Sequence, residues 1–412
     1  MKRYRLIAAV GSVAMLTAVA SGSSAYGGSN GPTQASPIRL GVLTSLTGPF
    51  APWGLQVRAG MALAVNEVNR AGGVRVRGRG QGRRLNLAVA DDQSGPAAVD
   101  GFRRLIEQER VVSVGGIIGS NVAVPTARLA EDARVPMFLV KAGNNEILTT
   151  SSRYTFRTCL PSAAMAAVPI VQLAQRRGIR SVGVIIADYA WGQSFKSSLE
   201  DAARAAPNIR FSVQVAPVPT TNFTSYLREL GDVSLIVATG HPPGSSLILA
   251  QAGQLGIRAP VVGAYSPYSL TARNAGAAAF GRWSDFKCMA TATRAYKNLA
   301  KRYLRAFPQN EFFEDDALAG YAYVKIIAEA IRNVGTNPQR IATYVRTHTF
   351  NIPGYAFPLR WTAWGELNRP RVQFAVLTRA APPERGLNTA STTFWPRVLF
   401  KSQPLAPYRP GS

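Results

Sequence analysis

Strand and helix patterns alternate along most of the chain, and this alternation is the feature that most constrains the fold. Short apolar runs such as Ile38–Leu43 and 85–90 are each followed by a segment of helical periodicity, for example Trp53–Arg70. The rhythm begins again after Cys159 and continues to 264, which predicts two consecutive halves of similar size. Because alternating strands and helices build parallel sheets covered on both faces, we expect an α/β fold with two doubly wound, Rossmann-like lobes.

The first residues of the chain do not follow this rhythm. MKRYR is basic, LIAAVGSVAMLTAVA is apolar, and Ser23-Ser24-Ala25 offers a cleavage site of small residues. This order predicts a secretory signal peptide over 1–25, and its apolar run is too short for a membrane span. No cysteine lies in this segment, so we expect no lipoprotein anchor and predict a soluble, exported protein.

The formal net charge is +25, which raises the question of a nucleic-acid partner. The basic residues are dispersed, and their densest cluster, RVRGRGQGRR at 75–84, is rich in glycine and lies between a helix pattern and a strand pattern. We interpret this cluster as a solvated loop and expect no nucleic-acid binding. The charge excess then reflects a general bias towards arginine.

The chain has two cysteines, Cys159 and Cys288, and two histidines, His241 and His348. An exported protein permits a disulfide between the cysteines, and two separate buried thiols are the alternative, because sequence does not fix their distance. With no cluster of cysteine and histidine, we expect no zinc site.

Motifs of catalysis are missing from the sequence. The first strand is not followed by G-x-G-x-x-G, and there is no Walker A motif, no G-x-S-x-G and no H-E-x-x-H. Asp91 and Asp92 form an acidic pair at the end of a strand pattern, where capping of a turn and helix is the favoured interpretation. We therefore expect a protein that is not an enzyme and that needs no cofactor.

The turns that follow the predicted strands carry aromatic and small polar residues. Ligands of open α/β sheets bind beyond the carboxyl ends of the strands, so these turns are the expected site. They read TSLTGPFAPWG, GSNVAVP and KAGNNE in the first half, and DYAWGQ, GHPPG and AYSPY in the second. A single aromatic residue is more often a packing residue, but their recurrence at equivalent turns indicates a cleft for a small molecule.

Several segments together resemble one family. LTSLTGPFAPWG, AVNEVNRAGG, DDQS, G-S-N-x-x-x-P and NFTSYLRELGDVSLIVATG are similar, in this order, to the Leu/Ile/Val-type (branched-chain amino-acid) periplasmic binding proteins of ABC transporters. The resemblance covers 37–265 well and 290–375 loosely. It implies the type I periplasmic-binding-protein fold, in which three crossing segments join two lobes that close on a ligand by hinge motion.

The resemblance also implies where the lobes and crossings lie. Crossings are expected near Arg157–Pro161, Lys287–Ala290 and Pro353–Trp361, which places Cys159 and Cys288 at crossings and favours their disulfide. The expected parts are an N-terminal lobe of 37–157 plus about 290–353, a C-terminal lobe of 158–289 plus about 354–380, and a loosely packed tail over 381–412. The sequence leaves the structure of 266–290 open.

Site residues carried over from the family stand in the turns named above. Trp53 matches the aromatic residue over the ligand side chain, and Trp191 matches the aromatic residue that presses from the second lobe. Ser120 and Asn121 match the turn at a helix N-terminus that holds a carboxylate. The resemblance thus implies a clamp of two indole rings with a carboxylate site beside it.

Other positions depart from the family pattern. Gly143, after Ala142, stands where relatives that bind α-amino acids have a hydroxyl, and Tyr265 stands where they have an acidic residue for the α-ammonium. His241 replaces a common aromatic residue. An unpaired ammonium in a closed cleft would be costly, so we expect a carboxylate ligand without a free α-amino group. Lys141 is expected either to add a positive contact or to be a solvated loop residue.

These expectations combine into one prediction of function. The chain is predicted to be a monomeric periplasmic protein that captures a small carboxylate-bearing ligand and delivers it to an ABC-transporter permease. A periplasmic sensor that signals to a membrane receptor is the alternative within the same fold. A secreted α/β enzyme is disfavoured because the catalytic motifs are missing.

Overall fold

The computed structural model describes residues 36–77, 80–239, 241 and 243–411, and contacts join this part of the chain into one unit. The predicted signal peptide, 1–25, lies outside the described residues. Among the described helices, none combines the length and the apolar character that a membrane crossing needs.

The first sheet has five strands in the order β2-β1-β3-β4-β5, and all of its pairs are parallel. The strands are β1 (Ile38–Thr44), β2 (Leu85–Asp91), β3 (Val114–Ile117), β4 (Met137–Leu139) and β5 (Thr155–Arg157). β1 and β3 are buried along nearly their whole length, because helices cover both faces of a parallel sheet. The α/β alternation expected for the first half is confirmed.

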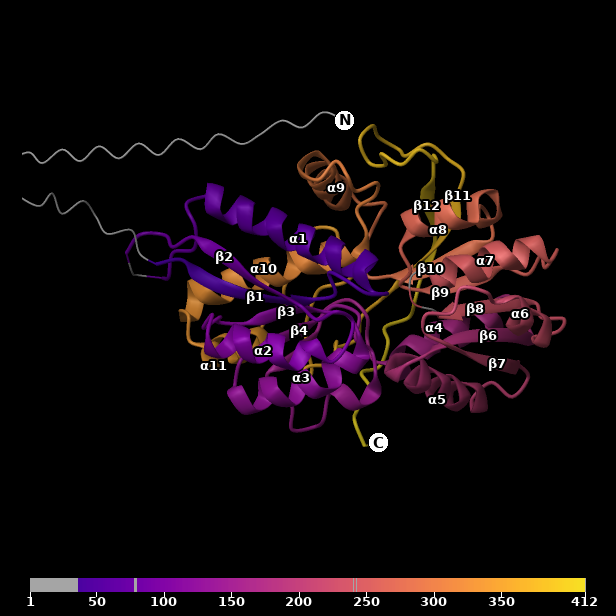
Figure 1. Ribbon diagram of the computed structural model, residues 1–412, viewed down its shortest axis with the longest axis horizontal. Helices are drawn as coiled ribbons and strands as arrows, with labels where there is room; N and C mark the ends of the chain where they lie inside the picture. Colours follow the sequence, from indigo (N-terminus) through magenta and orange to yellow (C-terminus); the bar gives the residue numbers. More distant parts are fainter. Residues whose placement is uncertain (1–35, 78–79, 240, 242, 412) are drawn as a thin grey trace, which may run out of the picture. The chain divides into compact units, whose positions relative to one another are not determined.

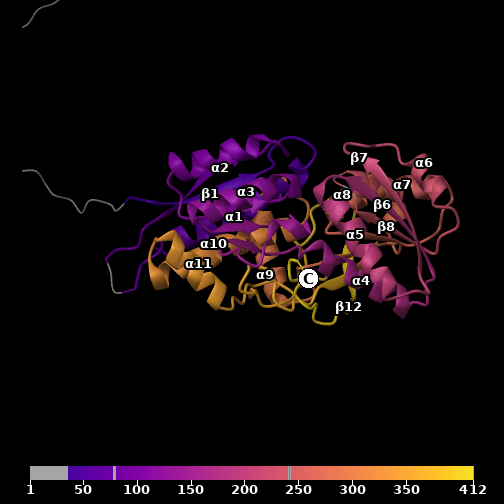
Figure 2. The same cartoon turned by 90° about the horizontal axis from the view of Figure 1, so that it is seen from below.

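Helices pack on both faces of this sheet (Figures 1 and 2). They are α1 (Ala51–Arg70), α2 (Ala97–Glu107), α3 (Ser120–Ala133), α10 (Asp315–Val334) and α11 (Pro338–Thr347), with the short turn η1 (Asn145–Ile147). α1 and α10 approach closely because glycines face the partner backbone. A Cβ atom at Gly60 would lie 1.9 Å from the Ala317 carbonyl oxygen, and one at Gly320 would lie 2.2 Å from that of Val57.

The second sheet has seven strands in the order β12-β11-β10-β9-β8-β6-β7. They are β6 (Ser181–Asp188), β7 (Arg210–Pro217), β8 (Leu235–Thr239), β9 (Val261–Ala264), β10 (Trp283–Lys287), β11 (Gln373–Thr378) and β12 (Trp395–Lys401). The pairs among β6, β7, β8, β9 and β10 are parallel. β11 pairs antiparallel with β10, and β12 pairs antiparallel with β11 at the edge of the sheet. Two sheets of mostly parallel strands confirm the predicted fold class.

Helices also cover both faces of the second sheet, with α4 and α5 on one side and α7 and α8 on the other (Figure 2). Their bounds are α4 (Ala163–Arg176), α5 (Ala190–Arg204), α6 (Thr224–Glu229), α7 (Gly244–Gln254) and α8 (Tyr268–Ala275), followed by η2 (Gly276–Ala279) and, after the sheet, α9 (Arg294–Ala306). We call the part built on the five-stranded sheet the first lobe and the part built on the seven-stranded sheet the second lobe.

The chain passes between the sheets after β5, after β10 and before β11, and the three passages bond to one another. The Ala290 N–H donates to the Gly354 carbonyl at 2.7 Å, and the Ala356 N–H donates to the Cys288 carbonyl at 2.7 Å. The Trp361 indole N–H donates to the Arg157 carbonyl at 2.6 Å. These contacts lie at the three crossings that the resemblance implied.

The prediction of a loosely packed tail over 381–412 is wrong. Strand β12 pairs with β11, and the rings of Phe400 and Phe374 stack with centroids 4.7 Å apart. Phe394 and Leu405 on either side of β12 are buried. An edge strand depends on a partner that is distant in sequence, and the surrounding prolines hid its short apolar alternation.

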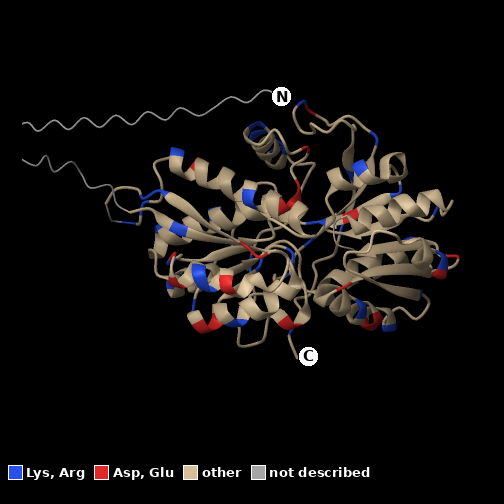
Figure 3. Cartoon of the chain, in the orientation of Figure 1, with Lys and Arg blue, Asp and Glu red and all other residues tan. Residues whose placement is uncertain are grey.

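Lysine and arginine side chains are spread over the helices and loops of both lobes, as Figure 3 shows. Helix α9 carries a row of them at helical spacing, Arg294, Lys297, Lys301 and Arg305, and Glu384 accepts hydrogen bonds from the two lysines. Elsewhere the distribution agrees with the dispersed charge of the sequence.

Candidate functional site

The strand order places the predicted turns at one position in each sheet. In the first sheet β1 lies between β2 and β3, and in the second β6 lies between β7 and β8, so the connections leave in opposite directions at these points. Such switch points open a crevice beyond the carboxyl ends of the strands. Trp53 and Ser120 lie after β1 and β3, and Trp191 and His241 lie after β6 and β8.

The turn that follows β1 is held by the acidic pair at the end of β2. Asp91 accepts hydrogen bonds from the N–H of Leu46 at 2.8 Å and the hydroxyl of Thr47 at 2.7 Å. Asp92 accepts one from the Ser45 hydroxyl at 2.6 Å, and burial raises the pKa of its carboxyl. These bonds agree with the turn-capping interpretation of the pair, and they fix the start of α1.

Trp53 is buried near the start of α1 and faces Lys141. The Lys141 Nζ lies 4.7 Å from the centre of the Trp53 ring, a cation–π distance. Phe50 packs against Trp53 with ring centroids 5.6 Å apart, and against Tyr189 of the second lobe at 5.4 Å. Aromatic residues from turns of both lobes therefore meet here.

Lys141 follows β4 and is not a solvated loop residue, since 4% of its side chain is exposed. Its Nζ lies 3.0 Å from each carboxylate oxygen of Asp316 and 3.8 Å from Asp315. It also donates a hydrogen bond to the Tyr265 carbonyl of the second lobe. Lys141 thus forms a buried ion pair within the first lobe and a hydrogen bond to the second lobe.

Tyr265 follows β9 with an unusual backbone conformation. Its φ of 60° lies in the left-handed region, which a bulky side chain rarely adopts. The Asp285 carboxylate of β10 accepts hydrogen bonds from the N–H groups of Tyr265 at 2.7 Å and Ser266 at 2.8 Å. Burial raises the pKa of Asp285 to about 6, and burial also raises the pKa of the Tyr265 hydroxyl well above its usual value. The Asp285 carboxylate thereby holds the Tyr265 carbonyl in place towards Lys141.

Ser120 begins α3 and is buried. Its Oγ accepts a hydrogen bond from the Asn144 N–H at 3.1 Å, and the Asn144 side chain donates to the Ala190 carbonyl of the second lobe at 2.9 Å. The neighbouring Asn145 N–H donates to the Ser194 hydroxyl at 3.0 Å. The loop after β4 therefore ties the start of α3 to the start of α5.

Gly143 is packed against the Trp191 ring. A Cβ atom at Gly143 would lie 2.2 Å from the Cζ3 atom of Trp191, so only glycine leaves room for the indole. Trp191 is buried and stacks on Phe195 with ring centroids 5.2 Å apart. Glycine at position 143 thus has a physical reason, which is the space that the Trp191 ring occupies.

Arg157 holds the loop after β4 through hydrogen bonds, and it was not among the predicted site residues. Its guanidinium donates to the carbonyl of Ala142 and, at 2.7 Å, to that of Asn144, and its Nε lies 3.0 Å from Glu366. Both side chains are fully buried, and burial lowers the pKa of Arg157 and raises that of Glu366. Their separation in sequence left no local signal for this pair.

Asn121 and His241 are the remaining predicted residues. Asn121 is exposed, and its side chain donates to the Ser94 carbonyl at 3.0 Å, so it links two turns of the first lobe. His241 is buried after β8, and its neighbours 240 and 242 lie outside the described residues.

The start of α10 contributes an acidic run that was not among the predicted site residues. Glu314, Asp315 and Asp316 are all fully buried. Asp315 lies 3.1 Å from the Lys287 Nζ, and Glu314 accepts a hydrogen bond from the Ser269 N–H at 2.9 Å. An acidic triplet between apolar residues, FFEDDALAG, was the signal available in the sequence.

Burial and the neighbouring charges shift the pKa values of this group. Burial alone would lower the pKa of Lys287, but the carboxylates of Asp315 and Asp285 raise it above its usual value. Burial raises the pKa of Asp316 to about 7, against the opposing effect of the Lys141 ammonium. Burial and the neighbouring lysine therefore act in opposite directions on the pKa of Asp316, and burial has the larger effect.

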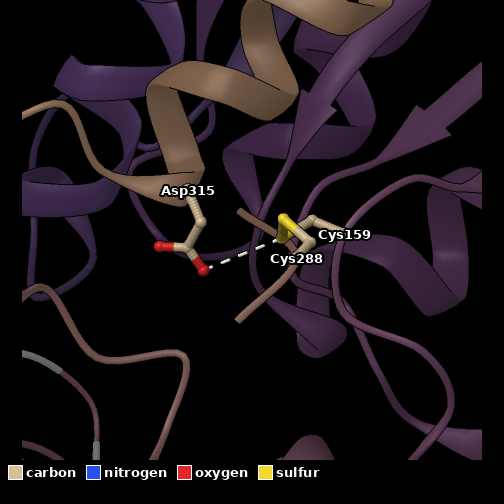
Figure 4. Close-up of side chains that lie close together, drawn as sticks. All are labelled: Cys159, Cys288 and Asp315. Atoms are coloured by element: carbon tan, nitrogen blue, oxygen red, sulfur yellow. Dashed lines mark hydrogen bonds between the residues drawn. A yellow bond between two sulfur atoms is a disulfide. The ribbon is translucent and has the colours of Figure 1, made fainter. Parts of the chain in front are cut away.

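Cys159 and Cys288 form a disulfide with Cα atoms 5.3 Å apart (Figure 4). The bridge joins the crossing after β5 to the crossing after β10, and this decides between the two alternatives left by the sequence. The Cys159 sulfur lies 3.7 Å from a carboxylate oxygen of Asp315. Because both sulfurs are bonded to each other, the three residues do not present free thiolate ligands to a metal.

Comparisons with known proteins show the family of the chain. A family model described as periplasmic binding protein matches residues 37–377. The Leu/Ile/Val-binding protein homolog 7 of Brucella suis biovar 1 is 28% identical over 316 residues, which cover 72% of this chain and 77% of that protein.

Two solved structures illustrate the likeness in fold. A solute-binding protein of an ABC transporter from R. palustris, in complex with benzoate, has a TM-score of 0.74 at 17% identity and covers 91% of this chain and 98% of its own. The branched-chain amino-acid substrate-binding protein LivJ from Streptococcus pneumoniae, in complex with isoleucine, has a TM-score of 0.71 at 19% identity, with 89% and 100% covered. The chain therefore belongs to the periplasmic binding protein family, in the Leu/Ile/Val-type branch with the type I fold.

Proposed function

We propose that the chain is a periplasmic solute-binding protein that captures a small carboxylate-bearing ligand between its lobes and delivers it to an ABC-transporter permease. In this proposal the lobes that close are 37–157 plus about 290–353, and 158–289 plus about 354–380 together with the edge strand β12. One observation carries the proposal. Turns at the switch points of both sheets meet, and they bury Trp53, Ser120 and Trp191 where they meet.

The start of α3 offers a position for the carboxylate. The first N–H groups of a helix have no partner within the helix and favour an anion. Ser120 stands at this start, and because its Oγ accepts from Asn144, its hydroxyl hydrogen is available to a ligand oxygen. Trp53 adds an indole N–H that has no hydrogen-bond partner among the described residues.

The two indole rings suit the body of such a ligand. Trp53 and Trp191 are each about 95% buried and come from different lobes. An aromatic contact contributes about 0.5–1.5 kcal/mol beyond the area that it buries. The solved relatives in complex with benzoate and isoleucine share a carboxylate beside an apolar body, which supports the same ligand class here.

A thermal-shift screen of the exported chain tests the proposal. The panel contains amino acids, aliphatic acids and aromatic acids, each with its neutral amide as a control. A carboxylate at about 100 times its Kd should raise the free energy of unfolding by about 2.7 kcal/mol. Stabilisation by the amides alone, or by no compound, would contradict the proposal.

Two variants locate the site. Trp53→Ala and Ser120→Ala should weaken binding of the stabilising carboxylate, whereas the matched controls Trp395→Ala and Ser212→Ala should not. Trp395 lies on the edge strand β12, and Ser212 lies on the edge strand β7. Equal binding by Trp53→Ala and the wild type would remove Trp53 from the site.

A further inference from the structure

The Lys141 ammonium is enclosed by the kinds of group that hold a cation away from water. Its Nζ lies 3.0 Å from each carboxylate oxygen of Asp316 and 4.7 Å from the centre of the Trp53 ring, and it donates to the Tyr265 carbonyl. A carboxylate, a carbonyl and an aromatic face together bind an ammonium ion well. The enclosure is therefore a complete cation site, and the chain fills it with its own lysine.

The walls of this site come from both lobes and are held in place. Asp316 is fixed in the first turn of α10, and Trp53 in the first turn of α1. Tyr265 comes from the second lobe, where the bond from its N–H to Asp285 maintains the left-handed backbone that presents its carbonyl. A ligand between the lobes would consequently lie beside an ammonium that already has its carboxylate partner.

We propose that Lys141 is the resident cation of the ligand cleft, so that the cleft takes carboxylates whose α-position is uncharged, such as desamino, hydroxy or keto acids, and disfavours α-amino acids. This inference rests on the proposed function, because it names the class of carboxylate. It follows from two observations. The carboxylate of Asp316 is already used by Lys141, and the buried indole N–H of Trp53 offers a donor to an acceptor oxygen.

The alternative, an α-ammonium in the same cleft, is unfavourable on two grounds. The ammonium would face the like charge of Lys141, and like charges in contact across an interface are strongly disfavoured. It would also lack a carboxylate of its own, and an unpaired buried charge is costly. Both effects disappear if the lysine side chain is removed while Asp316 remains.

Matched ligand pairs test the inference on the wild-type chain. The pairs are L-leucine with 4-methylpentanoate and L-phenylalanine with 3-phenylpropanoate, measured by isothermal titration calorimetry. We expect the desamino member to bind at least about tenfold more tightly, which corresponds to ~1.4 kcal/mol. Equal binding, or tighter binding of the amino acid, would overturn the inference and leave the proposed function standing.

A lysine truncation supplies a readout that does not depend on the natural ligand. In Lys141→Ala, propylammonium should raise the unfolding temperature, and 1-butanol at the same concentration should not. Neither compound should do so in the wild type. The same variant should lose the preference for the desamino acids. If propylammonium has no effect on Lys141→Ala beyond that of 1-butanol, Lys141 does not fill a cation site.

Two further variants serve as controls. Lys141→Ala combined with Asp316→Asn should not respond to propylammonium, because the carboxylate is gone. Lys287→Ala removes another buried lysine, whose bonds are to Asp315 and the Ser266 carbonyl, and should keep the preference for desamino acids. Lys141→Gln retains a hydrogen-bond donor without the charge, and it replaces the alanine variant in the ligand-pair measurement if that chain does not fold.

The two proposals fail in different ways. If no carboxylate of either pair or of the wider panel binds the wild type, the proposed function fails, and the propylammonium experiment still decides whether Lys141 occupies a cation site. If carboxylates bind without regard to the α-ammonium, only the role of Lys141 fails.

Discussion

Removing the disulfide between Cys159 and Cys288 should cost the chain a large part of its stability. The two cysteines are 129 residues apart in sequence, so the bridge restricts a long stretch of the unfolded chain. The chain-entropy relation for a loop of this length gives about 5 kcal/mol at 25 °C. In the folded state, backbone hydrogen bonds also join the crossings, so the bridge is not their only connection.

Equilibrium unfolding in urea measures this effect. The free energy of unfolding of the oxidised wild type is compared with that of the double variant Cys159→Ala, Cys288→Ala, and with the wild type under a thiol reductant. Both should be lower than the oxidised wild type by up to about 5 kcal/mol. Agreement between the variant and the reduced wild type shows that the bridge, and not the loss of two buried sulfurs, causes the change.

A thiol titration in denaturant gives the refuting result. The denatured, unreduced wild type should show no reactive thiol, since both of its cysteines are bonded. Two reactive thiols per chain, or equal stability of the variant and the oxidised wild type, would refute the reasoning.

Three other substitutions give expected outcomes. Gly143→Ala should cost about 1–3 kcal/mol in urea unfolding because its methyl group overlaps the Trp191 ring, and additivity with Trp191→Leu in a double-mutant cycle would contradict this contact. Glu366→Gln leaves Arg157 buried without its partner and should lower the free energy of unfolding by about 3–5 kcal/mol; a change below 1 kcal/mol would show that the pair is dispensable. Burial raises the pKa of Asp316 from 3.8 to about 7, so its contribution to stability is full below pH 4 and is lost as the pH rises through 7. Asp316→Asn should flatten this part of the pH profile of unfolding, and an unchanged slope would contradict the assignment.

The alternation of strands and helices was readable from the sequence because it depends on local patterns. Apolar runs ending in turn residues located β1 and β2, and helical periodicity located α1. β11 and β12 were not found, because an antiparallel strand at a sheet edge is specified by its distant partner.

The sequence predicted the residues of the candidate site that follow from the position of a strand end. It did not predict contacts between residues that are far apart in the sequence. The rule that ligands bind beyond strand ends located Trp53, Ser120 and Trp191. The role of Lys141 was not readable, because its partner Asp316 is 175 residues away. The same limit hid the pair of Arg157 and Glu366.

The structure of the chain bound to the carboxylate that stabilises it most tests the central claim most directly. We predict that the carboxylate lies within hydrogen-bond distance of the Ser120 hydroxyl at the start of α3, with the ligand body between Trp53 and Trp191. A ligand bound outside the two switch points, or one that contacts a single lobe, would contradict the account.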